Sequence, residues 1–478
     1  MKNFTAIILA AGKGTRMKSS TPKVLFPLAG KILLSYPVDL LKKLKAKRIV
    51  VVTGHGSGQV REEFKKDKLR FVLQSPQLGT GDAVKCAMEE LKNQSGDVLI
   101  LSGDVPLLAA ETIKALFKVH EKKPKGKDKK SKNAISFISF ITNKPKGYGR
   151  VVRDSENLVT SIVEERDCLP SERKISEVNG GIYLADLEFL RSNLAKLKTS
   201  NKQGEYYLPD LIKIARSKGQ GVSALTVIDE SEVMGINNRL ELSKAEAAVR
   251  ERILKALMLG GVTITAPSAT YIDYGVKIGK DTVISPNVFL KGQVRIGSDV
   301  IIEEGVKITN STIGSGVIIK SHSVIEDAVI GAGSEVGPFA RIRPGTVLSA
   351  SSRIGNFVEV KNSKVGKGTK INHLSYVGDA LIGEDVNIGA GVITCNYDGV
   401  NKHRTIIKDN VFIGSDSQLV APVTIGKGAY IGSGSTITKD VLSSSLALTR
   451  AEQKNIKDWA KRKKAKKNKS KKNKKKKV

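Results

Sequence analysis

Residues 7–25 of the chain read IILAAGKGTRMKSSTPKVL and could bind phosphate groups. The apolar run ends at Leu9, and the following positions supply small residues and cations: Ala10, Ala11, Gly12, Gly14, Arg16, Lys18 and Lys23. Backbone N–H groups reach phosphate oxygens only where side chains are absent, so a glycine-rich basic loop after a strand suits a polyphosphate. The spacing matches neither GxxxxGK(S/T) nor GxGxxG, the two common fingerprints. The residues alone therefore leave two interpretations open, a polyphosphate site and a tight turn.

His373, in the segment KINHLSYVGDA, is the second residue that could do chemistry. Imidazole exchanges protons near neutral pH and can serve as a general base. Its polar neighbours in the repeat are Lys361, Asn372 and Tyr376. A single histidine is more often a surface residue or a hydrogen-bonded structural one, so both interpretations stay open.

The first 228 residues must position the phosphate loop, and their pattern is typical of an α/β domain. Short apolar runs alternate with amphipathic stretches, and the strand-like runs are residues 5–10, 48–54, 70–74, 97–104 and 133–140. This alternation predicts βαβ units around a largely parallel sheet. Such sheets bind ligands at the carboxyl ends of their strands, where residues 9–16 and Asp104 fall.

A different pattern begins after residues 237–261, which read as a connecting helix ended by Gly260 and Gly261. Apolar residues then recur every six positions, at Ile278, Ile284, Leu290, Ile296, Ile302 and Ile308, and again at Ile382, Ile388, Ile425, Ile431 and Ile437. A period of six predicts a parallel β-helix of hexapeptide repeats, in which each coil stacks on its neighbours. Residues 396–410, NYDGVNKHRTIIKDN, interrupt the repeat and are predicted to project as a loop.

The formal net charge of +33 is concentrated in two segments. Residues 461–478 contain thirteen Lys or Arg and no acid, and residues 121–133 contain seven Lys against two acids. Blocks of like charge repel themselves, which predicts a flexible tail and an elongated surface loop. The tail could contact RNA, DNA or an anionic membrane surface by counterion release, or it could be a solvated tail with no dedicated partner.

The three cysteines, Cys86, Cys168 and Cys395, lie far apart and form no CxxC pair, which argues against a disulfide framework or a zinc site. A reducing compartment is therefore expected. The apolar start of the chain continues into the basic loop, which argues against a signal peptide. No apolar run approaches the roughly 20 residues that span a bilayer. These features predict a soluble, cytoplasmic protein.

With these pieces placed, the chain resembles the bacterial family that fuses an N-acetylglucosamine-1-phosphate uridyltransferase to a glucosamine-1-phosphate N-acetyltransferase. The motifs that carry the resemblance are LAAGKGTRM, PKVL, LGTGDA, GDVPL, GYGR, IVEE, QGEYYLPD, GINNR, RIRPG, NFVEVKNS, NHLSYVGDA and ITCNYDG. The resemblance implies an α/β nucleotidyltransferase (Rossmann-like) domain at 1–228, a linker with a connecting helix at 229–261 and a left-handed β-helix at 262–450. The Lys-rich tail at 451–478 is not a family feature. The family is also homotrimeric, and its product, UDP-N-acetylglucosamine, enters cell-wall peptidoglycan and lipopolysaccharide.

For the uridyltransferase the resemblance implies a UTP site that neutralises charge with Arg16 and Lys23. The other nucleotide contacts are assigned to Leu9, Ala10, Ala11, Gly12, Gln74, Gly79 and Thr80, with the last three at the uracil. Asp104 and Asn237 are implied to bind Mg²⁺; alternatively, the one could end a strand and the other could cap the connecting helix. The sugar phosphate is assigned to Gly149, Glu164 and Asn179, although turn chemistry could also explain Gly149.

For the acetyltransferase the resemblance makes His373 the general base, with Glu359 orienting its imidazole. Glucosamine-1-phosphate is assigned to Arg343, Lys361, Tyr376 and Asn387. Acetyl-CoA contacts are assigned to Ala390, Asn396, Tyr397, Ser415, Ser433 and Arg450, of which Asn396 and Tyr397 also complete the sugar pocket. No covalent acetyl-enzyme is implied, and Cys395 is expected to be a packed residue.

Two departures from the family pattern concern substrate contacts: Asp82 stands where many relatives have His, and Gly180 where Thr is common. Two rival functions remain. A single-activity sugar nucleotidyltransferase with a β-helix would release no thiol from acetyl-CoA, and a binding protein on an inactive scaffold would depend on its basic tail.

Overall fold

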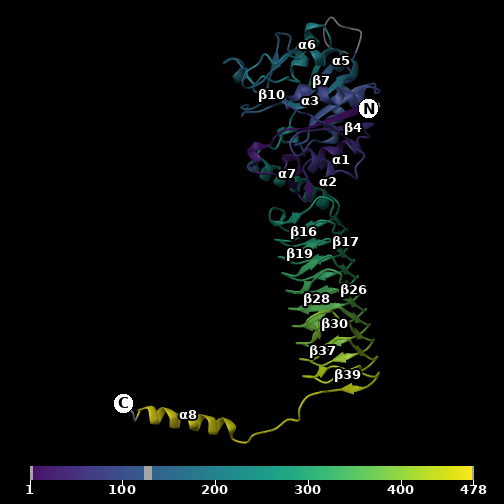
Figure 1. The fold of residues 1–478 in the computed structure, drawn as a ribbon, viewed down its shortest axis with the longest axis vertical. Helices are drawn as coiled ribbons and strands as arrows, with labels where there is room; N and C mark the ends of the chain where they lie inside the picture. The colour runs from purple at the N-terminus through teal and green to yellow at the C-terminus, as the bar shows by residue number, and fades with distance from the viewer. Residues whose placement is uncertain (1–3, 123–131, 476–478) are drawn as a thin grey trace. The chain divides into compact units, whose positions relative to one another are not determined.

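The computed structural model describes residues 4–122 and 132–475, with 468–475 by their backbone alone. The chain forms two compact units. One comprises Met1–Leu259 with Tyr271–Gly275, and the other Gly260–Thr270 with Val276–Val478 (Figure 1).

Among the described residues, the N-terminal unit is built on a nine-stranded sheet. Its strand order is β11 (Val222–Val227), β7 (Ile135–Ile141), β10 (Glu177–Asp186), β6 (Asp97–Ser102), β1 (Phe4–Ala10), β4 (Arg48–Thr53) and β5 (Arg70–Leu73), with β8 (Arg150–Arg153) and β9 (Val159–Val163) beside β10. All five strand-like runs of the sequence are strands: β1, β4, β5, β6 and β7. The sheet is less uniformly parallel than expected, because β10 runs antiparallel to both β6 and β7.

Helices cover both faces of this sheet. Successive side chains of a strand point to opposite faces, so Ile7 and Ile8 of β1 enter different cores. The core around Ile8 includes residues of α1 (Ser35–Lys43), α2 (Ser57–Glu63) and α4 (Ala110–Glu121). The core around Ile7 includes residues of α3 (Thr80–Ala87), α5 (Leu187–Asn193) and α6 (Asp210–Ser217).

The predicted connecting helix is present as α7 (Arg239–Leu259) and belongs to the N-terminal unit. Its buried Ala245 and Val249 join a third core with Leu28 of β2 (Pro27–Leu28) and Leu33, just after β3 (Lys31–Ile32). This packing fixes the start of α7, where residues of the candidate site lie.

The second unit is the parallel β-helix that the period of six predicts, and it is left-handed, as the family resemblance implies. In the described chain it comprises three parallel sheets of 11, 10 and 9 strands. Apolar residues 18 positions apart are strand partners, for example Ile284 with Ile302 and Leu290 with Ile308, and all four are fully buried. Three hexapeptides therefore make one coil, and the repeated Ile and Leu fill its interior.

Glycines at the corners let the coils stack closely. A Cβ on Gly279 would lie 2.6 Å from the backbone carbon of Gly297, and one on Gly297 would lie 2.6 Å from the backbone nitrogen of Ser315. Real Cβ atoms do not approach so closely, which explains why glycine follows Ile278 and Ile296 at these corners.

Several strands of the β-helix carry the predicted acetyltransferase residues or adjoin them. They are β25 (Arg341–Ile342), β27 (Arg353–Asn356), β28 (Glu359–Lys361), β30 (Lys370–His373), β31 (Tyr376–Gly378), β33 (Asn387–Ile388), β34 (Ile393–Cys395) and β35 (Thr405–Ile407). The predicted loop at 396–410 is shorter than expected, because β35 and the turn after it resume the coil.

The segment predicted as a flexible tail contains a helix, α8 (Trp459–Lys475). Long unbranched Lys side chains have a favourable helix propensity. The described side chains of α8 are exposed. The other Lys-rich segment falls largely on residues 123–131, outside the described residues.

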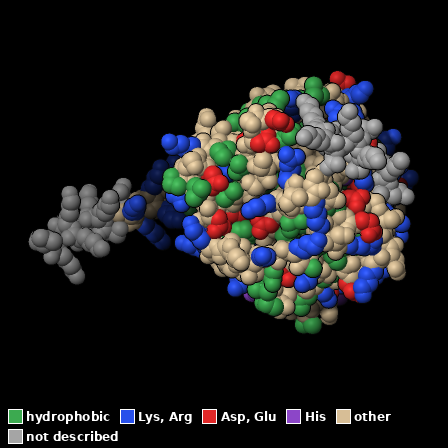
Figure 2. All heavy atoms as spheres, turned by 90° about the horizontal axis from the view of Figure 1, so that it is seen from above, with side chains coloured by type: hydrophobic (Ala, Val, Ile, Leu, Met, Phe, Trp, Pro, Cys, Tyr) green, Lys and Arg blue, Asp and Glu red, His purple; other side chains and the backbone are tan. Residues whose placement is uncertain are grey.

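Lys and Arg side chains elsewhere are interspersed with acidic and apolar ones on the face that Figure 2 presents, and they form no continuous basic patch there. The three cysteines, all within the described chain, are free. Across residues 4–122 and 132–475, no helix has the length and apolar character needed to cross a bilayer.

Candidate functional site

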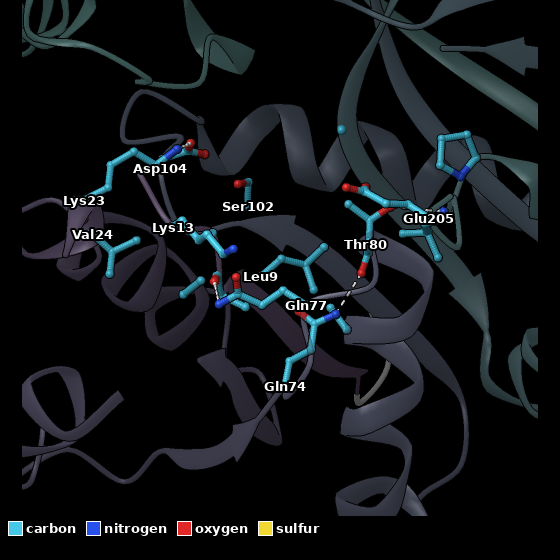
Figure 3. A pocket seen from close by; sticks show the side chains of 18 of the residues that line it. Leu9, Lys13, Lys23, Val24, Gln74, Gln77, Thr80, Ser102, Asp104 and Glu205 are labelled. Carbon is cyan, nitrogen blue, oxygen red and sulfur yellow. Dashed lines mark hydrogen bonds and ion pairs between the residues drawn. The ribbon is translucent and has the colours of Figure 1, made fainter. Parts of the chain in front are cut away.

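A cavity of about 610 Å³ in the N-terminal unit lies at the carboxyl ends of β1, β5 and β6 (Figure 3). The predicted residues that line it are Leu9, Ala10, Ala11, Gly12, Lys23, Gln74, Gly79, Thr80, Asp104, Glu164 and Asn179. Gly149 and Asn237 contact these lining residues, and Arg16 donates to Asn237. All the residues predicted for uridylyl transfer therefore gather at one place, although they come from loops far apart in the sequence.

The loop after β1 is shaped by one glycine and one glutamine. Gly14 has a φ of 62°, and a Cβ there would lie 3.0 Å from the Cβ of Lys23. Gln77, which the sequence did not indicate, donates from Nε2 to the backbone oxygen of Ala11 at 2.7 Å. No neighbour lies within 4 Å of the Cβ position of Gly12, so the loop backbone is open to the cavity there.

The side-chain oxygens of Asp104 and Asn237 both contact the Lys23 ammonium group at the cavity. The Lys23 ammonium forms an ion pair with Asp104, which is 7% exposed, and donates to Asn237 Oδ1 at 3.3 Å. Arg16 donates to the same Oδ1 at 2.9 Å. Figure 3 shows Lys23 and Asp104 pointing toward one another. Asp104 therefore does more than end a strand.

Asn237 is not the cap of the connecting helix. The cap of α7 is Asn238, whose Oδ1 accepts from the backbone nitrogen of Glu241 at 2.9 Å. Glu241 in turn accepts from the backbone nitrogen of Asn237 at 2.7 Å. Asn237 is held by its backbone, and its side-chain oxygen is left to face Lys23 and Arg16.

The donor set fits a magnesium ion. A carboxylate and an amide oxygen, Asp104 and Asn237, face the same point, and Mg²⁺ prefers such oxygen ligands while keeping several waters. No group of three or more His, Cys, Asp or Glu that could hold a metal occurs in the described part of the chain. The remaining ligands of such an ion would have to be substrate oxygens and water.

Two of the predicted sugar residues, Glu164 and Asn179, line the cavity, and Gly149 lies beside both. A Cβ on Gly149 would lie 3.0 Å from Ile162 Cγ2 and 3.2 Å from Glu164 Oε1, so a larger residue would crowd this carboxyl. Asn179 donates from its backbone to the Gly149 oxygen at 2.9 Å and from Nδ2 to the Tyr183 hydroxyl at 2.6 Å. Gly180, one of the two departures, lies where β10 bulges between Asn179 and Tyr183, with its Cβ position 3.0 Å from a backbone oxygen.

Glu164 has an unusual protonation behaviour for a carboxyl group. Burial, followed by the nearby carboxylates of Asp210, Asp167 and Glu205, raises the pKa of Glu164 to about 7, and Arg150 opposes this only in part. The side chain therefore exists near neutral pH as a mixture of carboxylic acid and carboxylate, so it can donate or accept a hydrogen bond.

This raised pKa predicts a pH-dependent stability. The ordinary pKa of this carboxyl is about 4.5, so between that pH and about pH 7 the folded protein holds a proton on Glu164 that the unfolded chain has lost. The free energy of unfolding should therefore fall as the pH rises through this interval, by a few kcal/mol at most. Denaturant titrations at a series of pH values should show that this fall is smaller in Glu164→Gln, whereas Glu156→Gln, at an exposed turn, retains it. Parallel profiles for all three proteins would contradict the assignment.

A second cluster of predicted residues lies on the outer face of the β-helix. Glu359 of β28 is the strand partner of Tyr376 of β31, and Lys361 lies two residues after Glu359. Arg343, just after β25, donates to Glu359 Oε1 at 2.6 Å. Asn387, on β33, lies on the strand next to β30. Arg343, Glu359, Lys361 and Tyr376 form a half-exposed polar surface across neighbouring coils, and Asn387 lies on another sheet of the β-helix.

His373 ends β30 and is exposed, and its partner is not the predicted one. Its Nδ1 lies 2.8 Å from Asn356 Oδ1, and the two residues face each other between β27 and β30. Because an amide oxygen can only accept, Nδ1 carries the proton and Nε2 keeps its lone pair. The expectation that Glu359 orients the imidazole is corrected: Glu359 is engaged by Arg343.

Asp379, which sequence reasoning missed, connects Asn396 of the loop after β34 to Lys361 and Asn362. It accepts hydrogen bonds from Asn362 and Asn396 and lies 4.0 Å from Lys361. Burial alone would raise the pKa of Asp379, but these two amides and the Lys361 and Lys402 ammonium groups outweigh it and lower the pKa.

Lys402, also missed, adds a cation to the same surface. The neighbouring Lys361 ammonium lowers the pKa of Lys402. With Arg343 they supply positive charge suited to a phosphate. The signal in the sequence was the run of cations within the segment that interrupts the repeat.

The loop between β34 and β35 is fixed by its own contacts. Asp398 accepts from the backbone nitrogens of Asn401 at 2.6 Å and Val400 at 2.7 Å, and lies 2.6 Å from His403 Nε2. The Asn401 contact, then those of His403 and Val400, lower the pKa of Asp398 to about 2. Tyr397 is exposed on this loop.

Four of the six predicted acetyl-CoA residues, Ala390, Ser415, Ser433 and Arg450, follow one corner of the coils, whereas Asn396 and Tyr397 lie on the loop between β34 and β35. The backbone nitrogen of Asp416, the residue after Ser415, donates to the Ala390 oxygen at 2.7 Å. The backbone nitrogen of Gly434, the residue after Ser433, donates to the Ser415 oxygen at 2.8 Å. Arg450 donates to the Ser433 oxygen at 2.8 Å. Burial raises the pKa of the Cys395 thiol, so it stays protonated and is a poor nucleophile.

Three family models match the chain. Residues 6–128 match the MobA-like NTP transferase domain, residues 266–354 the GMPPB C-terminal domain and residues 404–439 the bacterial transferase hexapeptide (six repeats). The first match contains the phosphate loop and Asp104, and the other two lie in the β-helix.

Full-length relatives carry the name "Bifunctional protein GlmU". The protein of Geotalea uraniireducens is 50% identical over 97% of this chain and 100% of its own length. Those of Trichlorobacter lovleyi and Shouchella clausii are 47% and 48% identical, over 96% and 97% of this chain and 98% and 100% of their own lengths. Similarity along both units favours two activities over one. The chain therefore belongs to the family of the bifunctional protein GlmU and is a transferase with one domain for nucleotidyl transfer and one for acetyl transfer.

Proposed function

We propose that the two clusters catalyse consecutive steps of UDP-N-acetylglucosamine synthesis. The β-helix transfers acetyl from acetyl-CoA to the 2-amine of glucosamine-1-phosphate. The N-terminal unit then transfers uridylyl from UTP to the N-acetylglucosamine-1-phosphate and releases pyrophosphate. The observation that supports this most directly is that most of the residues predicted for uridylyl transfer line one cavity of the N-terminal unit.

In uridylyl transfer, a phosphate oxygen of the sugar phosphate attacks the α-phosphorus of UTP, and pyrophosphate leaves in line. Positioning and charge neutralisation provide most of the catalysis of such a step. Lys23 and Arg16 neutralise the phosphates, and the open backbone from Leu9 to Gly12 approaches them. Asp104 and Asn237 would hold Mg²⁺, which stabilises negative charge on the phosphates.

The sugar phosphate binds across Gly149, Glu164 and Asn179. Gly149 keeps space beside the Glu164 carboxyl. Because the pKa of Glu164 is about 7, this carboxyl can donate to or accept from a sugar hydroxyl.

In acetyl transfer, His373 Nε2 removes a proton from the 2-ammonium group of the sugar. The free amine attacks the thioester carbonyl carbon, the carbon–sulfur bond breaks, and the leaving thiolate takes up a proton. Arg343, Lys361 and Lys402 bind the phosphate, and Tyr376 and Asn387 contact the sugar. The row of Ala390, Ser415, Ser433 and Arg450 suits the extended acetyl-CoA chain.

The hexapeptide family match supports an oligomer that acts on small molecules. We assign a homotrimer, as the family resemblance implies. A cytoplasmic location follows from the use of UTP and acetyl-CoA, which are made there. The exposed Lys side chains of α8 suit a weak contact with an anionic polymer or membrane surface.

The test follows two products separately. The purified protein is supplied with glucosamine-1-phosphate, acetyl-CoA, UTP and Mg²⁺, and free thiol and pyrophosphate are measured. Both should appear, and pyrophosphate should depend on acetyl-CoA unless N-acetylglucosamine-1-phosphate is added. Pyrophosphate without thiol would refute acetyl transfer, and thiol without pyrophosphate would refute uridylyl transfer.

A further inference from the structure

Gln74 is a buried side chain at the end of β5 that lines the cavity (Figure 3). Its Nε2 donates to the backbone oxygen of Gly79 at 3.0 Å and to Asp82 Oδ2 at 2.7 Å. A side-chain amide has two N–H donors on its nitrogen. Both donors of Gln74 are therefore used within the protein.

The two partners fix the orientation of this amide. A backbone carbonyl and an ionised carboxylate can only accept hydrogen bonds. Flipping the amide would place Oε1 against two oxygens and lose both bonds, one of them assisted by the charge of Asp82. Within the described chain, no group donates to Oε1 of Gln74. This oxygen is the polar atom of the amide that is left for a ligand, and it can only accept.

Asp82 lies in the first turn of α3 and is half-buried. A carboxylate there also suits the partial positive charge of the helix N-terminus. That effect would stabilise the helix but would not choose between bases. A histidine at this position would offer either a donor or an acceptor, depending on its tautomer, and would not hold the amide in one orientation.

We propose that Asp82 is a positioning residue that sets the base selectivity of nucleotidyl transfer. It holds Gln74 with Oε1 toward the base, where it accepts from the N3–H of uracil. Cytosine has a lone pair at N3, so two acceptors would face each other and the base would be rejected. The inference rests on the proposed placement of the uracil beside Gln74.

The test compares UTP with CTP as substrates for pyrophosphate release with N-acetylglucosamine-1-phosphate. In Asp82→Asn, the new amide supplies a donor as well as an acceptor, so only the Gly79 backbone oxygen still opposes the flipped orientation of Gln74. We expect the ratio of kcat/KM for UTP to that for CTP to fall by about ten-fold, and kcat/KM for CTP itself to rise. A residue that only supports the fold would not raise activity toward CTP.

Two further variants complete the design. Asp82→Ser, whose hydroxyl can also donate or accept, provides a second route if Asp82→Asn folds poorly. Glu89→Gln removes an exposed charge that pairs with Lys92 and should leave the ratio unchanged. An unchanged ratio in both Asp82 variants, or equal losses for UTP and CTP, would overturn the proposal. If the unsubstituted protein released no pyrophosphate from UTP, the proposed function itself would fail.

Discussion

We expect His373→Ala to lower acetyl transfer by about 10² to 10⁴-fold, the contribution typical of a positioned general base, and to leave uridylyl transfer unchanged. The amine nucleophile is protonated near neutral pH and cannot attack until a base removes the proton. The hydrogen bond from Nδ1 to Asn356 leaves Nε2 as that base. The measurement is free thiol released from acetyl-CoA, with pyrophosphate release from N-acetylglucosamine-1-phosphate and UTP followed in parallel.

His322→Ala is the matched control. His322 is a second histidine of the β-helix, stacked on Phe339 rather than facing the predicted sugar residues. It should retain acetyl transfer. Equal loss in the two histidine variants, or loss of both activities in a folded His373→Ala protein, would contradict the assignment of a base to His373.

Asp104→Asn should have the opposite effect, with uridylyl transfer reduced by about 10² to 10³-fold and acetyl transfer retained. The substitution keeps the size of the side chain but removes the carboxylate that pairs with Lys23. It leaves two neutral amide groups in place of a carboxylate and an amide. The site should therefore bind a divalent cation more weakly. Pyrophosphate release should be measured over a range of Mg²⁺ concentrations, because weakened metal binding shifts the requirement to higher concentration.

Asp39→Asn serves as its control. Asp39 also pairs with a lysine of the N-terminal unit, Lys31, but its carboxylate is 47% exposed and lies outside the cavity lining. Its removal should cost little activity, since exposed ion pairs contribute 0 to about 1 kcal/mol. An Asp104→Asn protein as active as Asp39→Asn would exclude the proposed metal site.

The sequence predicted the β-helix well because its geometry is local. A coil of three hexapeptides brings residues 18 positions apart together, so the pairing of Ile284 with Ile302 follows from counting. The same reasoning could have found Asn356, which lies 17 residues before His373. It was missed because the period of apolar residues marks the interior of the coil and carries no signal for the polar residues at its corners.

The N-terminal site was harder to derive from local pattern. The contact of Gln74 with Asp82, or of Asn237 with Lys23, joins loops whose relative placement depends on the whole sheet. Family motifs pointed to Gln74, Lys23 and Asn237, but no periodicity says which atom of an amide faces a ligand. The partner of Glu359 was wrongly expected for a similar reason, since Arg343 and His373 are both within a coil of it.

The close stacking at Gly279 and Gly297 limits how this architecture can change its length. One residue added or deleted within a strand of a coil would turn the following side chains from the interior to the surface. The register of every later coil would be shifted in the same way. Extra residues are tolerated only at a corner, as between β34 and β35, where the chain leaves the coil and returns in register. Insertions in related enzymes should therefore accumulate at corners beside the substrate. New substrate specificity can arise there because a longer loop does not disturb the stacking of the coils.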